Sequence, residues 1–124
     1  MPHLIFESTP QLAESIDFPS LMLDVHANLA RNGYATLSDL KSRSYEAEGF
    51  LAGDDATAQF IVVRLLLTKA RTASVQHAMG QLIHDAVRAA IERAGVGGSW
   101  QCAVLVVDES GAPYIKTVQT ATLV

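Results

Sequence analysis

The stretch QFIVVRLLLT at residues 59–68 constrains the fold more than any other part of this 124-residue chain. It is a nearly continuous run of β-branched and aliphatic side chains, which is typical of a strand buried on both faces. A second run of this kind, CAVLVV, covers residues 102–107. The two runs predict a sheet whose centre is apolar and which needs covering layers on its faces.

Two more strands and two helices complete the predicted pattern. HLIFE at residues 3–7 and residues 41–46 indicate strands. A helical stripe begins at Phe18 and ends at Asn32-Gly33, a left-handed stop signal. The segment between the first strand and this helix contains turn formers and small polar residues.

The longest predicted helix covers residues 72–94, with Thr72 or Ser74 as its N-cap and Gly95 after its end. The order strand, helix, strand therefore occurs twice. This order predicts an α+β chain, a β-α-β-β-α-β subunit with a four-stranded sheet and two helices on one face, in a single domain of residues 1–124. YIKTV at residues 114–118 is expected to return as a short final strand.

The predicted architecture leaves one face of an apolar sheet without cover. Exposed apolar patches of this size mark interfaces, so we expect an oligomer. Arg64 lies within the apolar run at 59–68. Because a buried unpaired charge is costly, we expect Arg64 to meet an acidic partner or to lie at the interface between subunits.

Composition excludes several classes of protein. The net charge is −4, which argues against a nucleic-acid-binding protein but permits a local cationic pocket. The single cysteine, Cys102, excludes an intrachain disulfide. No signal peptide and no run of about 20 apolar residues occurs, so we expect a cytoplasmic protein without membrane contact. His77 and His84 are seven residues apart, too far for a paired metal site on a helix, so no metal is expected.

Pro2 stands directly behind the initiator methionine, in the sequence MPHLIFE. Small second residues usually permit removal of the methionine, which would leave Pro2 as a free secondary amine. While Met1 remains attached, the Pro2 nitrogen is an amide and has no basicity. The structural alternative is a proline tolerated at the first position of a strand.

The N-terminal MPHLIFE, the KSR at residues 41–43 and Arg71 before the long helix together resemble the 5-carboxymethyl-2-hydroxymuconate isomerase family. This family is a branch of the tautomerase superfamily, whose members catalyse with an N-terminal proline. The resemblance runs from Met1 to about Val107 and includes the order of the elements. It implies a homotrimer in which the sheets pack around a central axis, with the active site close to a subunit boundary.

The resemblance implies a cofactor-free isomerase that interconverts a 2-hydroxy-dienoic acid and its 2-oxo unsaturated tautomer. Pro2 would be the general base of this reaction. A free α-amine has a pKa near ~8, and burial or nearby cations lower it toward neutral pH. The alternative from another class is a non-catalytic trimer of the same fold that binds or senses a small molecule.

Substrates of this class are small anionic unsaturated carboxylic acids, which cations would bind. The candidates are Lys41, Arg43 and Arg71, and Arg binds a carboxylate through two parallel hydrogen bonds. Lys41 and Arg43 are two apart on a predicted strand and so share a face. The family commonly shows Arg-Ser-Arg where this chain has Lys-Ser-Arg, and Lys41 lacks the planar fork. Phe50 stands where the family tends to place an aromatic residue in the pocket.

Overall fold

The computed structural model describes residues 1–121. Four strands form one sheet in the order β2-β1-β3-β4. Their bounds are β1 (His3–Ser8), β2 (Lys41–Glu46), β3 (Gln59–Leu67) and β4 (Trp100–Asp108). β1 is parallel to β2 and β3 is parallel to β4, whereas β1 and β3 are antiparallel. The predicted fold is confirmed: two β-α-β units join along their first strands.

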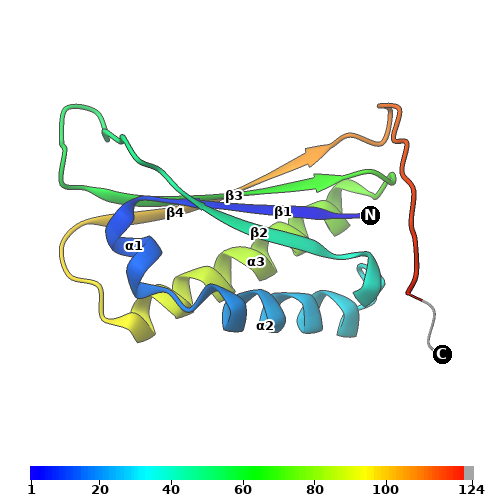
Figure 1. The fold of residues 1–124 in the computed structure, drawn as a ribbon, viewed down its shortest axis with the longest axis horizontal. Coiled ribbons are helices and arrows are strands. Elements are labelled where there is room, and N and C mark those ends of the chain that lie inside the picture. The colour runs from blue at the N-terminus through cyan, green and yellow to red at the C-terminus, as the bar shows by residue number, and fades with distance from the viewer. Residues whose placement is uncertain (122–124) are drawn as a thin grey trace.

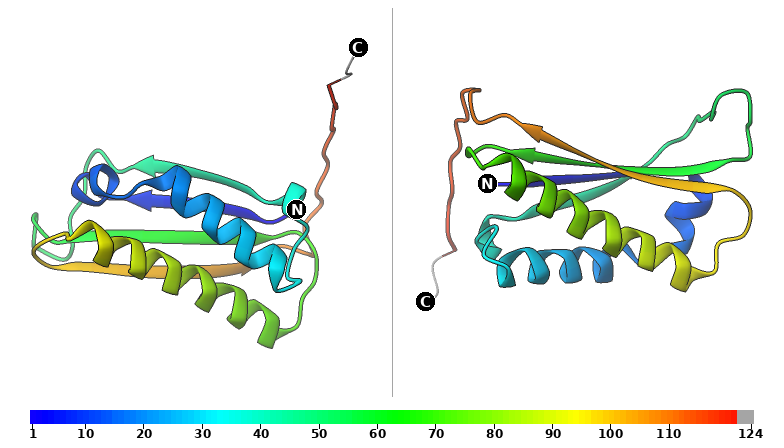
Figure 2. Two further views of the ribbon diagram at one scale, coloured as in Figure 1. Left: turned by 90° about the horizontal axis from the view of Figure 1, so that it is seen from below. Right: turned by 180° about the vertical axis from the view of Figure 1, so that it is seen from behind.

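Both long helices cover the same face of the sheet (Figures 1 and 2). α2 (Phe18–Arg31) connects β1 to β2, and α3 (Ala73–Ala94) connects β3 to β4. The Asp17 carboxylate caps α2 by accepting from the Ser20 amide at 3.2 Å. Gly95 ends α3 in the left-handed conformation, with φ of 65°, which glycine adopts without steric cost.

The core lies between this face and the helices. Alternate residues of the strands point into it, including Leu4 and Phe6 of β1, and Val63 and Leu65 of β3. The residues between them point to the other side, which we call the open face of the sheet. Its central residues are Ile5, Val62, Arg64, Leu66, Ala103, Leu105 and Val107.

The structure corrects the predicted burial of the 102–107 strand. β4 is an edge strand, so only its helix-facing side chains pack against the core, namely Trp100, Cys102, Val104 and Val106. Leu105 on the open face is 56% exposed. Arg64, the neighbour of Leu105 on β3, is also exposed and forms no ion pair within residues 1–121. Within residues 1–121, no element therefore covers Leu105 and Arg64 on the open face.

The structure adds one short helix that the sequence did not predict, and it contradicts one expected strand. Residues 10–15 form a helix, α1 (Pro10–Ser15), because Pro10 suits a first helical turn and Leu12 can be buried against the core. Residues 114–118 form no strand. A turn after β4 directs them away from the sheet, and they run past the end of the sheet where the chain starts (Figure 1).

One short helix, η1 (Leu37–Asp39), precedes β2. Among the described residues, no helix is both long and apolar enough to cross a membrane.

Candidate active site

The starts of β1 and β2 lie side by side and bring Pro2 close to the predicted cations. His3 is opposite Lys41 on β2 and opposite Leu66 on β3. The Lys41 amide donates to the buried Pro2 carbonyl at 3.2 Å. Lys41 and Arg43 share the open face, as their spacing predicted, because side chains two apart on a strand point the same way.

Thr68, directly after β3, holds the first residue of the chain. The Met1 amine donates to the Thr68 hydroxyl at 2.7 Å, and this hydroxyl also lies 3.2 Å from the Met1 carbonyl oxygen. That carbonyl carbon is bonded to the Pro2 nitrogen, so the nitrogen also lies beside Thr68. In this chain, which carries Met1, the Pro2 nitrogen is an amide.

The surroundings of the N-terminus are rich in positive charge. Burial is the main cause that lowers the pKa of the Met1 amine. Asp39 opposes this effect, while Lys69, Lys116 and Arg71 lower the pKa further. An amine at this place therefore loses its proton more readily than one at an exposed chain end.

His3 links two polar side chains. Arg43 Nη1 donates to His3 Nδ1 at 2.8 Å, and His3 Nε2 lies 2.8 Å from the Tyr114 hydroxyl. The rings of His3 and Tyr114 meet edge to face, with centroids 5.9 Å apart. Burial, followed by the charges of Arg43, the N-terminus and Lys41, lowers the pKa of His3. These surroundings therefore favour the neutral form of the imidazole.

A cavity of about 290 Å³ opens beside this group. Its walls come from β1, β2, the end of β3 and the segment after β4. They are mostly apolar, and they place one arginine and one histidine beside Thr68. The lining residues are His3, Arg43, Leu66, Thr68, Glu109, Ala112 and Tyr114.

The other predicted cations lie outside the cavity wall. Arg71 donates to the Tyr34 carbonyl at 3.2 Å and to the Lys69 carbonyl at 3.2 Å. It thereby ties the segment after α2 to the segment before α3, although its charge still reaches the N-terminus. Lys41 Nζ donates to the Ser38 carbonyl at 2.6 Å. Arg43 is thus the predicted cation that lines the cavity.

Phe50 lies at the opposite end of the sheet. It packs edge to face against Phe60, with ring centroids 6.3 Å apart. Phe60 lies beyond the last residue of β1, because Ser8 is opposite Ile61. Six residues of strand span about 20 Å, so Phe50 does not reach Pro2 of its own chain.

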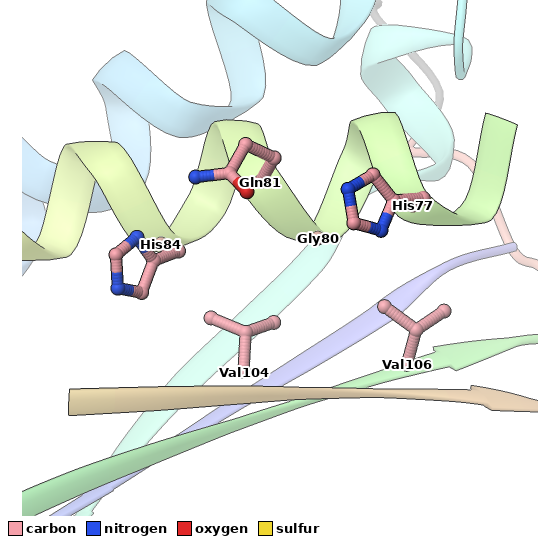
Figure 3. Close-up of a pocket in the computed structure, with 6 residues that line it drawn as sticks. All are labelled: His77, Gly80, Gln81, His84, Val104 and Val106. Carbon is pink, nitrogen blue, oxygen red and sulfur yellow. The ribbon is translucent and has the colours of Figure 1, made fainter. Parts of the chain in front are cut away.

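A second cavity, of about 220 Å³, lies between α3 and β4 (Figure 3). His77 and His84 stand at its two ends on α3, over Val104 and Val106 of β4. Gly80 permits the close approach here, because a Cβ on it would meet Val106 Cγ2 at 2.9 Å. No three His, Cys, Asp or Glu side chains within residues 1–121 are grouped to hold a metal.

The sequence model of one protein family, described as 5-carboxymethyl-2-hydroxymuconate isomerase, matches residues 2–97. The chain belongs to this isomerase family. A search of curated proteins by sequence found no match. The matched region contains Pro2, Lys41, Arg43, Phe50 and Arg71, and it ends before β4.

Solved structures agree with the family assignment. The chain is similar to a 5-carboxymethyl-2-hydroxymuconate isomerase from Deinococcus radiodurans R1, with a TM-score of 0.80 and 21% identity over 95% of this chain and 90% of that one. A 5-carboxymethyl-2-hydroxymuconate delta-isomerase gives a TM-score of 0.79 and 14% identity, over 99% and 96%. A structure described as "Q0 fused 4-OT wild type symmetric trimer" gives 0.61 and 18%, over 86% and 84%. The family match and the tautomerase-like fold together make this protein an isomerase.

The sequence did not single out three residues of the cavity wall. His3 is part of the MPH motif, and its place beside Pro2 is a usable signal. Thr68 ends an apolar strand and carries no motif. Tyr114 lies in a segment that was expected to form a strand, and it lies outside the family match.

Proposed function

We propose that this isomerase converts a 2-hydroxy-dienoic acid of the 5-carboxymethyl-2-hydroxymuconate type into its 2-oxo unsaturated tautomer, with the amine of Pro2 as general base after Met1 is removed. One observation carries the proposal. The bond between Met1 and Pro2 lies against Thr68, and Thr68 lines a cavity that Arg43 also lines. A free Pro2 amine would therefore lie next to a cavity lined by a cation suited to a carboxylate.

The proton transfer needs one group that accepts and then returns a proton. The Pro2 amine takes the proton of the 2-hydroxyl, and the oxygen electrons form the carbonyl. The double bonds shift along the chain, and the Pro2 ammonium returns the proton to carbon 5. Burial and the nearby Lys69, Lys116 and Arg71 favour the neutral amine in its resting state, as they do for Met1.

Arg43 would bind a substrate carboxylate, and the charges of Lys41 and Arg71 would favour the negative charge that develops on the 2-oxygen. Arg43 supports this role best because its guanidinium faces the cavity and His3 orients it. Lys41 and Arg71 act at longer range, since their side chains are bonded to backbone carbonyls.

We further propose a homotrimer. The open face is largely apolar, no helix within residues 1–121 covers it (Figure 2), and one solved structure of similar fold is described as a symmetric trimer. If Phe50 contacts substrate, it must do so from a neighbouring subunit, because its own Pro2 lies about 20 Å away. Three chains of 13.3 kDa would give a particle of about 40 kDa.

The test is ketonisation of 2-hydroxymuconate, followed by ultraviolet absorbance. Two forms are compared: protein whose mass proves the loss of Met1, and a form that retains Met1. We expect turnover in the first form and a loss of at least about a thousandfold in the second, because an amide nitrogen cannot act as a base. Equal turnover in both forms would exclude Pro2 as the base. No turnover in either form, across several such acids, would instead favour a binding role.

A further inference from the structure

The segment after β4 packs against the end of the sheet at which β1 begins and β3 ends. The Glu109 amide donates to the Leu67 carbonyl at 2.8 Å, and the Ala112 amide donates to the Glu109 carbonyl at 3.0 Å. The Asp108 carboxylate accepts from the Ser110 amide at 2.9 Å. These bonds make a defined turn that carries Tyr114 to the cavity wall, past the end of the family match.

The donors and acceptors between Arg43, His3 and Tyr114 can be assigned. Arginine only donates, so His3 Nδ1 must accept. A neutral imidazole that accepts at Nδ1 carries its hydrogen on Nε2, and it therefore donates to the Tyr114 oxygen. The Tyr114 oxygen accepts this bond, and its own hydrogen remains free for another partner.

In the chain that carries Met1, the partner of the Tyr114 hydrogen is the sulfur of Met1. The Tyr114 hydroxyl lies 3.2 Å from Met1 Sδ, and a thioether sulfur is a weak acceptor. Met1 thus occupies the place where a better acceptor would sit. Its removal opens this place and leaves a phenol donor in the same cavity as Arg43, with the width of the His3 ring between them.

We propose that Tyr114 binds substrate: after the removal of Met1, its hydroxyl donates to a carboxylate oxygen of the unsaturated acid in the cavity. His3 is then a positioning residue that orients both Tyr114 and Arg43. The inference rests on the proposed function and extends it, because it assigns a substrate contact to the segment that follows β4. Arg43 and Tyr114 are hydrogen-bond donors on the two sides of the His3 ring, and this arrangement suits an acid with more than one carboxylate.

Kinetics of the Met1-free protein with 2-hydroxymuconate test this role. Tyr114→Phe keeps the ring against His3 and removes only the hydroxyl. We expect KM to rise roughly ten- to hundredfold with little change in kcat, because the lost hydrogen bond to a charged group is equally strong in substrate and transition state. Tyr34→Phe is the control, since Tyr34 packs against the core on the helix side of the sheet and its hydroxyl forms no hydrogen bond within residues 1–121. An unchanged KM in Tyr114→Phe, or an equal rise in the control, would overturn the proposal.

A binding measurement separates this inference from the proposed function. The probe is 2-oxohexanedioate, a saturated diacid without a double bond to move, titrated by calorimetry into the Met1-free protein. Weaker binding to Tyr114→Phe by tenfold or more supports the contact even if no turnover occurs. Equal binding to both proteins overturns it while leaving Pro2 as the base. No binding to either protein, together with no turnover, overturns both proposals.

A purely structural role for Tyr114 predicts different results. It would lower the thermal unfolding midpoint of Tyr114→Phe and disturb the turn after β4, whereas a substrate contact leaves both unchanged. Nitrogen-15 spectra of the His3 ring report the tautomer directly. We expect a hydrogen on Nε2 and none on Nδ1, and the opposite tautomer would overturn the assignment of Tyr114 as a free donor.

Discussion

At the residue scale, His3 shows how the hydrogen bonds of one side chain depend on its charge state. Its Nδ1 accepts from Arg43, and a second proton on the ring would have to sit on this nitrogen. Burial and the neighbouring positive charges disfavour that proton and lower the pKa of His3. His26 Nε2 is hydrogen-bonded to the Ser42 hydroxyl at 2.6 Å. Burial and, to a lesser extent, the charge of Lys41 lower the pKa of His26 as well.

These two histidines predict how stability changes with pH. The unfolded chain takes up a proton near pH 6.5, whereas the folded chain does so only at lower pH. The stability that comes from keeping these two histidines neutral is therefore fully present above about pH 6.5. It is lost as the pH falls through the pKa values of the histidines in the folded chain. We expect the thermal unfolding midpoint to fall between pH 7.5 and 5.5, and to fall less steeply in His3→Asn. Parallel curves for the two proteins would contradict the assignment to His3.

At the element scale, the start of α3 is decided by one hydroxyl. The sequence left Thr72 and Ser74 as alternative N-caps. The structure selects Thr72, whose side chain accepts from the Val75 amide at 3.3 Å. Among residues 1–121, the Ser74 hydroxyl is hydrogen-bonded to the Thr72 hydroxyl alone, at 3.2 Å, and it caps no backbone amide. The cap lies directly after Arg71, so it also determines where the chain turns from the site into α3.

Thr72→Ala is expected to lower the free energy of unfolding by about 1 kcal/mol, because one amide of the first turn loses its partner. The matched control Ser74→Ala should change it by no more than a few tenths of a kcal/mol. Urea denaturation at one fixed protein concentration measures both, which removes the effect of any oligomer. A larger loss in Ser74→Ala than in Thr72→Ala would show that the cap is assigned to the wrong residue.

At the scale of the whole molecule, the open face is the main surface on which apolar side chains remain exposed. Leu105 is 56% exposed there, beside Arg64 on β3. Both helices cover the other face, so nothing within residues 1–121 can bury these side chains (Figure 2). A trimer with its sheets turned inward would cover them and would bring the far end of one sheet toward a neighbouring subunit.

Leu105→Arg tests the proposed trimer. The new charge would be buried beside Arg64, and a buried charge without a partner is costly. We expect sedimentation to show about 40 kDa for the unaltered protein and a shift toward 13.3 kDa for the variant. Leu23→Arg makes the same change on the exposed side of α2, where Leu23 is 73% exposed, and should leave the mass unchanged. A mass of 13.3 kDa for the unaltered protein would exclude the trimer.

Local sequence patterns suffice to predict the four strands, the two long helices and the family. These follow from periodicity, caps and the position of short motifs, all of which act between residues that are near in the chain. Lys41 and Arg43 share a face because of strand geometry alone. The prediction of a strand at residues 114–118 is wrong because no local pattern distinguishes a strand from an extended segment that leaves a sheet.

The tertiary structure alone decided what surrounds the N-terminus. Thr68, Arg43 and Tyr114 meet there from positions up to 113 residues from Met1, and no local pattern encodes such a meeting. Strand order decided that β4 is an edge and that Phe50 lies far from Pro2, because a sheet can pair the same strands in several orders. Hydrogen bonding then selected the neutral His3 ring, since this property depends on partners that only the folded chain brings within reach.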